Sequence, residues 1–315
     1  MPRKDHPKLS IKQQIKLLED KGVQFDLVSK DAAANYLTDQ IYFFKIKQFL
    51  RLFSNESGNV SNVDFAQLME LSSLDSTLRK TVLSMCLDIE HYLRVRLIKD
   101  TTYDDRIDGF QIVEEFFKSN PGVKNNVEDK KNSGINAVNE IVGQYYDDHS
   151  IWSLIEILSQ KDFFTLYTLY YSNADSDLYN QNKEILSMLY PVRMLRNAAA
   201  HNNGLLCLIK VNDDEKRTKS NYSLIDYISK YSSNISKKTR DKKLSSFIIH
   251  DICAMLYVYF SVVYKPNERS SLKNLTNLVN IEMKNNADFF NNALIKTTFD
   301  FLQKALDSFC KYGIV

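Results

Sequence analysis

The chain has 315 residues, of which 44% are hydrophobic and 25% are charged, and its formal net charge at pH 7 is +2. This composition is typical of a globular protein. The small net charge excludes a general electrostatic attraction to nucleic acid or to an anionic membrane, so such binding would need a local patch. The 8 glycines and 5 prolines are too few for the many corners of a β-rich architecture. We therefore predict an all-α protein, folded as a single compact multi-helix bundle.

The first third of the chain shows helical spacing of its apolar residues. We expect a helix from Ser10 to Gly22 and a second one that begins after Ser29 as its N-cap. The aromatic, lysine-rich stretch at 41–50 fits a helix whose lysines reach solvent from a buried surface. After a polar loop at 54–62, leucines at helical spacing predict one or two helices over 64–102.

The middle third continues the helical pattern with one interruption. We expect a short helix at 109–119 and a strongly apolar helix or helix pair at 152–171. The polar segment at 123–133 has mixed charge and reads as a mobile loop. A further helix at 185–200 contains Pro191, which marks either a kink or a new helix start.

The last third begins with a basic region. Residues 210–243 contain ten Lys or Arg residues against five Asp or Glu, a net charge of +5. Apolar helices at 244–264 and 281–311 follow. We expect an N-terminal helical extension at 1–62, a helical core at 63–204, and a basic segment with C-terminal helices at 205–315.

The cysteines and the chain start indicate the compartment. Cys86, Cys207, Cys253 and Cys310 are far apart and form no C-x-x-C pair, which is typical of free thiols in a reducing cytosol. No apolar run reaches transmembrane length, and the N-terminus lacks the core of a signal peptide. We expect a cytoplasmic protein without a membrane partner.

One motif carries a chemical suggestion. Arg196 and His201 are separated by four residues, and Asn197 directly follows the arginine. Arginine offers a fixed fork of donors for a phosphate, and histidine exchanges protons near neutral pH. Asn202-Asn203-Gly204 then predicts the end of the helix. The alternative is structural: a surface salt bridge for Arg196, alanines that let helices approach, and a helix-capping His201.

Four further groups of residues appear in a fixed order before this motif. They form an N-terminal signature, an aromatic run after a leucine, a set with charged residues within the helical segment at 64–102, and a segment around the single tryptophan. These groups are Leu9-Ser10-Ile11, Gln14-Ile15, Leu17-Leu18 and Lys21-Gly22; Tyr36-Leu37 with Tyr42-Phe43-Phe44; Asp75, Leu78-Arg79, Ile89-Glu90 and Leu93-Arg94; and Trp152-Ser153-Leu154-Ile155-Glu156.

With Arg196-Asn197 and Ala200-His201, these segments resemble the Abi-like family, the AbiD/AbiF-type abortive-infection proteins of bacteria, which is assigned to the HEPN superfamily. The resemblance covers about two thirds of the chain, from Leu9 to Gly204. It implies a HEPN-like helical bundle. The family often carries another histidine or a basic residue after its motif histidine, whereas this chain has Asn202.

The resemblance implies a metal-independent endoribonuclease of antiphage defence, acting as a toxin and using no cofactor. The substrate's own 2′-OH would attack the adjacent phosphate and leave a cyclic phosphate and a 5′-hydroxyl. His201 would transfer protons, Arg196 would stabilise the phosphoryl charge, and Asn197 would orient one of them or bind the substrate. The expected partners are substrate RNA and a structured regulatory non-coding RNA, and no DNA is expected.

A single chain supplies one such histidine, whereas acid and base roles call for two. Residues five apart also differ by about 140° around a helix axis, so Arg196 and His201 do not share one face. Both points predict a homodimer whose two motifs face a shared cleft. The alternative is a catalytically silent HEPN module that binds RNA or protein as a scaffold or sensor. A third reading is a helical adaptor with no role in nucleic-acid binding.

Residues around the motif have two interpretations each. Glu90 and Arg94 would either form a network that holds the motif residues in place or make only an intrahelical ion pair. Trp152 and the aromatic stretch at 42–47 fit the core better than a platform for unpaired bases. The remaining candidates would contact RNA or merely lie in solvent, and they are Arg193, Asn202, Lys237, Lys238, Arg240, Lys242 and Lys243.

Overall fold

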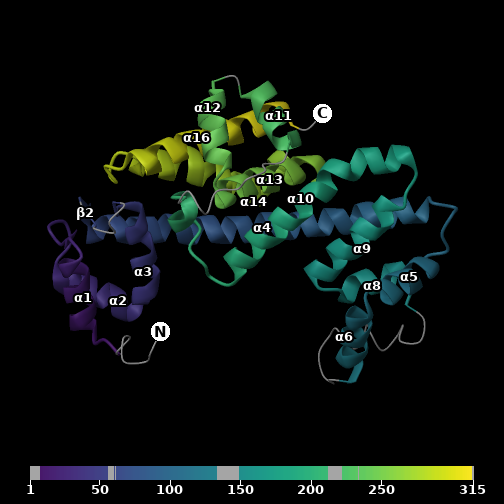
Figure 1. Ribbon diagram of the computed structural model, residues 1–315, viewed down its shortest axis with the longest axis horizontal. Coiled ribbons are helices and arrows are strands. Elements are labelled where there is room, and N and C mark those ends of the chain that lie inside the picture. The colour runs from purple at the N-terminus through teal and green to yellow at the C-terminus, as the bar shows by residue number, and fades with distance from the viewer. Residues whose placement is uncertain are drawn as a thin grey trace.

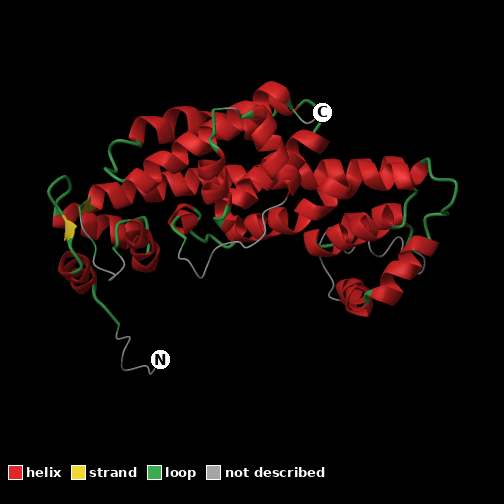
Figure 2. Ribbon diagram, turned by 45° about the horizontal axis from the view of Figure 1, so that its top comes forward, coloured by secondary structure: helices red, strands yellow, loops and turns green. Residues whose placement is uncertain are grey.

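The computed structural model describes residues 8–55, 60, 62–132, 149–211, 222–232 and 234–313. In these ranges almost all regular structure is helical (Figure 2), so the all-α prediction is confirmed. The exception is a short parallel pair formed by β1 (Val23–Gln24) and β2 (Val63–Asp64), in which Val23 lies opposite Val63. This pair ties the N-terminal helices to the start of the longest helix.

Helix α4 (Phe65–Thr102) is one continuous helix of 38 residues. It is therefore about 57 Å long and runs the length of the molecule (Figure 1). Its start is set by a capping box. The Asp64 side chain accepts a hydrogen bond from the Ala66 N–H at 2.8 Å, and Gln67 Oε1 accepts one from the Asp64 N–H at 2.9 Å.

The N-terminal helices lie at one end of α4 (Figure 1). Ser29 is the N-cap as predicted, and Ser10, predicted as the helix start, is the N-cap one residue before it. Their hydroxyls accept hydrogen bonds from Ala32 N–H and Gln13 N–H. Gly22, with a φ of 97°, follows the first helix and confirms its predicted end. The elements of this group are α1 (Ile11–Asp20), α2 (Lys30–Asp39), α3 (Phe43–Phe49) and the 3₁₀ turn η2 (Leu50–Leu52).

A second group of helices lies at the other end of α4. The predicted loop at 123–133 is wrong as far as Asn132, because α6 occupies this segment and Ser133 lies outside the described residues. Pro121 suits the first position of a helix, where no N–H is needed, and Val127 is buried. The group consists of α5 (Gln111–Ser119), α6 (Pro121–Asn132), α8 (Ile151–Ile157) and α9 (Gln160–Ser172).

Helix α10 (Ser176–Ala200) crosses the middle of the molecule (Figure 1) and packs on α4, α9 and α13. Pro191 lies inside this helix, so it does not start a new one. The C-terminal helices lie along the side of α4 opposite the N-terminal helices (Figure 1). They are η3 (Leu206–Ile209), α11 (Tyr222–Tyr231), α12 (Lys237–Leu244), α13 (Phe247–Val262), η5 (Pro266–Glu268), α14 (Ser270–Asn277), the π-helical η6 (Leu278–Met283), α15 (Lys284–Asn286) and α16 (Ala293–Tyr312).

The helix predicted over 281–311 is continuous only from Ala293. Before it, the π-helical η6 passes into the short helix α15, and turns follow in which Asn291 has a φ of 44°. One cluster of buried apolar residues extends from Ile15 to Phe309, so all parts of the described chain share a core. Proposed boundaries at 62/63 and 204/205 remain predictions.

The cysteines fit the prediction of free thiols, since three are buried and Cys310 is half-buried. No single helix of the described chain is both long and apolar enough to cross a membrane. Helices α12 and α13 reach that length and composition only together, as a pair bent by 101°.

Candidate functional site

His201 is the C-cap of α10, and its side chain is exposed. The turn that follows is a Schellman motif: the Asn202 N–H donates to Ala199 O at 3.2 Å, and the Asn203 N–H donates to Ala198 O at 2.9 Å. Asn202 has a φ of 58° and takes the left-handed position. The predicted helix end is thus confirmed, with asparagine rather than glycine at its turning point.

Gly204 does not form this turn. Its lack of a side chain lets Cys207 and Gln48 pack closely against the backbone at this position. A Cβ atom there would lie 2.9 Å from Cys207 Sγ and 3.1 Å from Gln48 Oε1. The Cys207 thiol donates to the Gly204 carbonyl at 3.1 Å. The chain leaving His201 therefore packs directly against α3.

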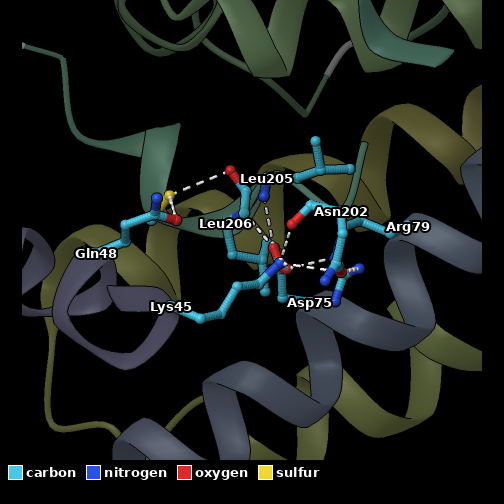
Figure 3. Close-up of polar contacts among 9 residues, drawn as sticks. Lys45, Gln48, Asp75, Arg79, Asn202, Leu205 and Leu206 are labelled. Atoms are coloured by element: carbon cyan, nitrogen blue, oxygen red, sulfur yellow. Dashed lines mark hydrogen bonds and ion pairs between the residues drawn. The ribbon is translucent and has the colours of Figure 1, made fainter. Parts of the chain in front are cut away.

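A buried carboxylate holds this turn from the side of α4 (Figure 3). Asp75 is 0% exposed. Its Oδ1 accepts hydrogen bonds from the Leu205 N–H at 2.6 Å and the Leu206 N–H at 2.8 Å, and its Oδ2 accepts one from Arg79 Nε at 2.8 Å. A carboxylate that accepts two backbone N–H groups and an arginine is fully satisfied without water.

A buried lysine holds the same turn from the side of α3. Lys45 is 1% exposed, and its Nζ donates to the Asn202 carbonyl at 2.5 Å. The same Nζ lies 3.7 Å from Asp75 Oδ2, and Arg79 Nη1 donates to Asn202 Oδ1. Burial lowers the pKa of Lys45, and the Asp75 charge opposes that change. Helices α3 and α4 thereby fix the backbone next to His201.

Arg196 lies on a different face of α10 from the His201 position, because five residues turn an α-helix by about 140°. Its side chain is half-buried, and its charge lies close enough to Cys86 on α4 to oppose the burial that raises the pKa of that thiol to about 12. Arg196 Nη1 donates to Asn197 Oδ1 at 3.3 Å, whereas Nε is buried and has no hydrogen-bond partner among the described residues. The two motif side chains thus occupy different faces, as their spacing predicts.

Glu90 and Arg94 form an intrahelical pair on α4, with Arg94 Nη2 2.7 Å from Glu90 Oε1. The Arg94 guanidinium also lies over the Phe163 ring of α9, 5.3 Å from its centre. Besides burial, the Glu90 charge also raises the pKa of the Cys86 thiol, whereas the Arg196 charge lowers it. Within the described residues no ion pair joins Arg196 to Glu90, so the predicted supporting role remains a prediction.

The basic residues predicted to contact RNA divide into two sets. Arg240 and Lys243 of α12 are buried, with exposures of 8% and 7%. Lys243 Nζ donates to Thr297 Oγ1 at 2.9 Å and to Thr298 Oγ1 at 2.7 Å. Arg193 lies over the Tyr190 ring at 5.3 Å. The exposed members of the α12 cluster are Lys237, Lys238 and Lys242.

Trp152 lies at the surface rather than within the core, since it is 37% exposed. Its ring covers Gly109, where a Cβ atom would come within 2.3 Å of the ring, and its Nε1 donates to Thr102 Oγ1 at 3.4 Å. In the described ranges, no three His, Cys, Asp or Glu side chains form a group that could hold a metal ion.

The profile of the Abi-like protein family matches residues 35–206. This match begins in α2 and ends at Leu206, whose N–H binds Asp75. The chain belongs to the Abi-like protein family. The match therefore includes both Arg196 and His201 together with the whole anchoring network. Membership associates this Abi-like protein with abortive infection. Comparisons with curated proteins and with solved structures gave no match.

Sequence reasoning missed the anchoring role of this network. Asp75 and Arg79 are among the residues that carry the family resemblance, yet their contacts were not predicted, and neither was the role of Lys45. One signal was available. Asp75 and Arg79 stand one turn apart in a helix whose neighbouring leucines are buried, and a charged pair in such a place needs partners from elsewhere in the fold.

Proposed function

We propose that this Abi-like protein is a HEPN-type endoribonuclease that needs no metal ion and acts in antiphage defence as a toxin. Cleavage would use the 2′-OH of the substrate as the nucleophile toward the adjacent phosphate, with a 2′,3′-cyclic phosphate and a 5′-hydroxyl as products. The AbiD/AbiF subtype and regulation by a non-coding RNA belong to the same proposal.

The observation that carries this proposal is the way His201 is presented. Its imidazole is exposed, while the backbone after it is held by three buried or half-buried side chains, Lys45, Asp75 and Arg79. A histidine that only caps a helix needs no such support. A proton-transfer group gains from it, because rates depend strongly on small errors of position.

In the proposed reaction, one imidazole takes the proton of the 2′-OH and another gives a proton to the leaving 5′-oxygen. Arg196 stabilises the charge on the phosphoryl oxygens. Asn197 Oδ1 accepts a hydrogen bond from Arg196, so Asn197 is suited to orient that guanidinium.

Two copies of the chain would supply the two imidazoles. On α10, Tyr190, Met194, Asn197 and His201 lie within about 60° of one another around the helix axis. Tyr190 is 60% exposed and Met194 is 43% exposed. If the twofold axis runs along this face, so that the two α10 helices lie parallel, the Met194, Asn197 and His201 side chains would each lie near their own copies. This arrangement suits the cytoplasmic homodimer that we propose.

The decisive experiment incubates the purified protein with mixed RNA, with and without EDTA, and analyses the product ends. We expect cleavage with cyclic phosphate ends that EDTA does not abolish. His201→Ala should lower the rate by at least about a hundredfold. His91→Ala is the matched control, because His91 is also an exposed histidine but lies on α4. Equal activity of both variants would refute the proposed role of His201.

A mixed-protomer experiment tests the shared site. Wild-type and His201→Ala chains are co-expressed at several ratios, and the specific activity is measured. If each site needs both histidines, the activity falls as the square of the wild-type fraction. A linear fall would show that each chain acts with its own histidine alone.

The second candidate is a catalytically silent module that binds RNA or protein. The half-burial of Arg196 against α4 favours it, since a guanidinium in that position does not reach the solvent near His201 within one chain. Tight RNA binding without cleavage under any condition would support this candidate.

A further inference from the structure

A long groove opens beside the end of α10. It has a volume of about 730 Å³ and lies between α4 on one side and α2 and α3 on the other. Its floor is a face of α4, along which Ala66, Met69, Ser73 and Ser76 recur at helical spacing. From Ala66 to Arg79 this floor spans about 20 Å of helix, which is longer than a single small ligand needs.

The end of the groove next to the motif is polar and positively charged. Arg79, Lys45 and Asn202 line it, and Asn202 directly follows His201 in the chain. At this end Lys45 and Arg79 carry two positive charges, and the fully buried Asp75 supplies one negative charge. The acidic Glu70 also lines the groove, but it stands nine residues before Arg79 on α4, about 14 Å away along the helix. The excess positive charge and the Ser76 hydroxyl suit an anionic group such as a phosphate.

Aromatic side chains occupy the wall that α2 and α3 contribute. Tyr36 and Tyr42 line the groove, and Tyr42 is 54% exposed. Tyr42 is the N-cap residue of α3, yet its side chain makes no capping hydrogen bond. The ring therefore has no structural task at the helix start and offers a flat surface for stacking.

The aromatic, lysine-rich stretch of α3 is thus divided between two environments. Lys45, Ile46 and Phe49 are buried, as the core interpretation predicts. Tyr42 and Phe44 are exposed, but only Tyr42 lines the groove. This pair of neighbouring exposed aromatic residues gives one ring inside the groove and one outside it.

We infer that the groove binds an unpaired segment of RNA, with a base stacked on Tyr42 and a phosphate beside Arg79 and Asn202, and that it leads the strand to His201. Stacking on aromatic rings combined with phosphate contacts is how proteins hold single-stranded RNA. The serine hydroxyls along the floor can bond to ribose 2′-OH groups. The identification of RNA as the ligand rests on the proposed function, whereas the shape and lining of the groove are observed independently of it.

The test measures RNA binding without cleavage. The full-length His201→Ala protein is titrated into a fluorescein-labelled, unstructured 10-nucleotide RNA at physiological salt, and anisotropy is recorded. Adding Tyr42→Ala should weaken binding about tenfold, the loss expected for one stacked base. Phe44→Ala is the matched control and should leave the affinity within twofold of the parent. Equal affinities for all three proteins would overturn the inference.

A second pair of variants probes the floor of the groove. Ser76→Glu places a carboxylate among the lining residues, whereas Thr77→Glu places the same charge on the neighbouring position of α4, which does not line the groove. We expect Ser76→Glu to weaken binding at least fivefold more than Thr77→Glu. Thermal unfolding of each variant shows whether it is folded, and similar affinities for two folded variants would contradict the inference.

The outcomes separate this inference from the proposed function. If wild-type protein cleaves RNA but Tyr42 does not matter for binding, the groove inference fails and the nuclease proposal stands. If Tyr42 matters for binding but no cleavage occurs, the reverse holds. Binding of AMP that depends on Tyr42, with no binding of the oligonucleotide, would replace the RNA strand with a free nucleotide and overturn the inference.

Discussion

The carboxylate of Asp75 has no exposed surface, yet it accepts three hydrogen bonds and lies 3.7 Å from a second cation, Lys45. Substitution of Asp75 should therefore destabilise the fold, because its hydrogen-bond partners are buried with it and would lose their acceptor. An amide at this position keeps one carbonyl oxygen but turns an NH₂ group toward donors. Removing the charge also leaves Lys45 and Arg79 without their counter-ion.

We therefore predict that Asp75→Asn lowers the free energy of unfolding by about 3 kcal/mol or more. Urea denaturation followed by circular dichroism measures this change. Asp288→Asn is the control, since Asp288 is 84% exposed and pairs with Lys296 at the surface. Its loss should stay below about 1 kcal/mol. Equal losses at both positions would show that the Asp75 network does not stabilise the fold.

The buried Lys243 should make the free energy of unfolding depend on pH. Burial lowers its pKa from 10.5 to about 8 in the folded protein, while the unfolded chain keeps the ordinary value. Between about pH 8 and 10.5 the unfolded state therefore binds more protons than the folded state, and the contribution of Lys243 to stability rises with pH. Below pH 8 both states are protonated, and the contribution is constant.

The measurement compares the free energies of unfolding of wild type and Lys243→Met from pH 7 to 10.5. The difference should shift in favour of the wild type by up to about 3 kcal/mol as the pH rises through this window. Groups common to both proteins cancel in this difference. The exposed Lys238→Met variant should show a flat difference. A flat difference for Lys243→Met would mean that its amine is not perturbed by burial.

At the scale of elements, helix ends were predictable where their signals are local. Ser10 and Ser29 cap the helices that begin one residue later, and the Asn202-Asn203-Gly204 segment ends α10. The contacts that anchor this end were not predictable in the same way. Lys45, which binds the Asn202 carbonyl, stands 157 positions earlier in the chain, and no local pattern specifies that pairing.

At α6 the local sequence pattern predicted the wrong structure, a loop instead of a helix. Its sequence is polar and of mixed charge, so it lacks the apolar stripe of an independent helix. Burial of Val127 against neighbouring helices supplies what the local pattern lacks. Tertiary packing therefore decides the structure of this segment, and the predicted loop was wrong for that reason.

The end of α10 provides a prediction for a pair of substitutions. Asn202 has a φ of 58°, and its Oδ1 accepts a hydrogen bond from Arg79. Both Asn202→Gly and Asn202→Ala remove the amide, but only glycine adopts this φ without strain. The alanine variant should be less stable than the glycine variant by about 1 kcal/mol.

Thermal and urea unfolding of the two variants measure that difference. Asn203→Gly and Asn203→Ala provide the control, because Asn203 is not among the residues with positive φ. The alanine variant at 203 should be at least as stable as the glycine variant. The same order at both positions would contradict the left-handed turn at Asn202.

At the scale of the whole molecule, α4 connects the parts that the candidate site needs. Its N-terminal half contributes Asp75 and Arg79 to the anchor, and its middle contributes Cys86, which lies beside Arg196. Helix α10 runs against it and carries the motif at its end. One chain thus holds the backbone beside its motif and presents one exposed motif histidine, so the proposed two-histidine site would require a second copy of the chain.

The α10 face that carries Met194 and His201 predicts how self-association and activity are linked. Met194→Glu places a charge in the middle of this apolar face, where a twofold interface would bring it close to its own copy. We expect the dissociation constant of the dimer to rise at least tenfold, on the order of 1.4 kcal/mol. Sedimentation velocity over a range of concentrations measures this constant.

RNA cleavage should fall with the dimer fraction and recover at protein concentrations that restore the dimer, because Met194 itself does no chemistry. Tyr264→Glu is the control, since Tyr264 is 66% exposed and follows α13 rather than lying on α10. It should leave both association and cleavage unchanged. Loss of cleavage in a Met194→Glu protein that remains fully dimeric would separate activity from assembly, and the shared site would then have to be abandoned in favour of a site within one chain.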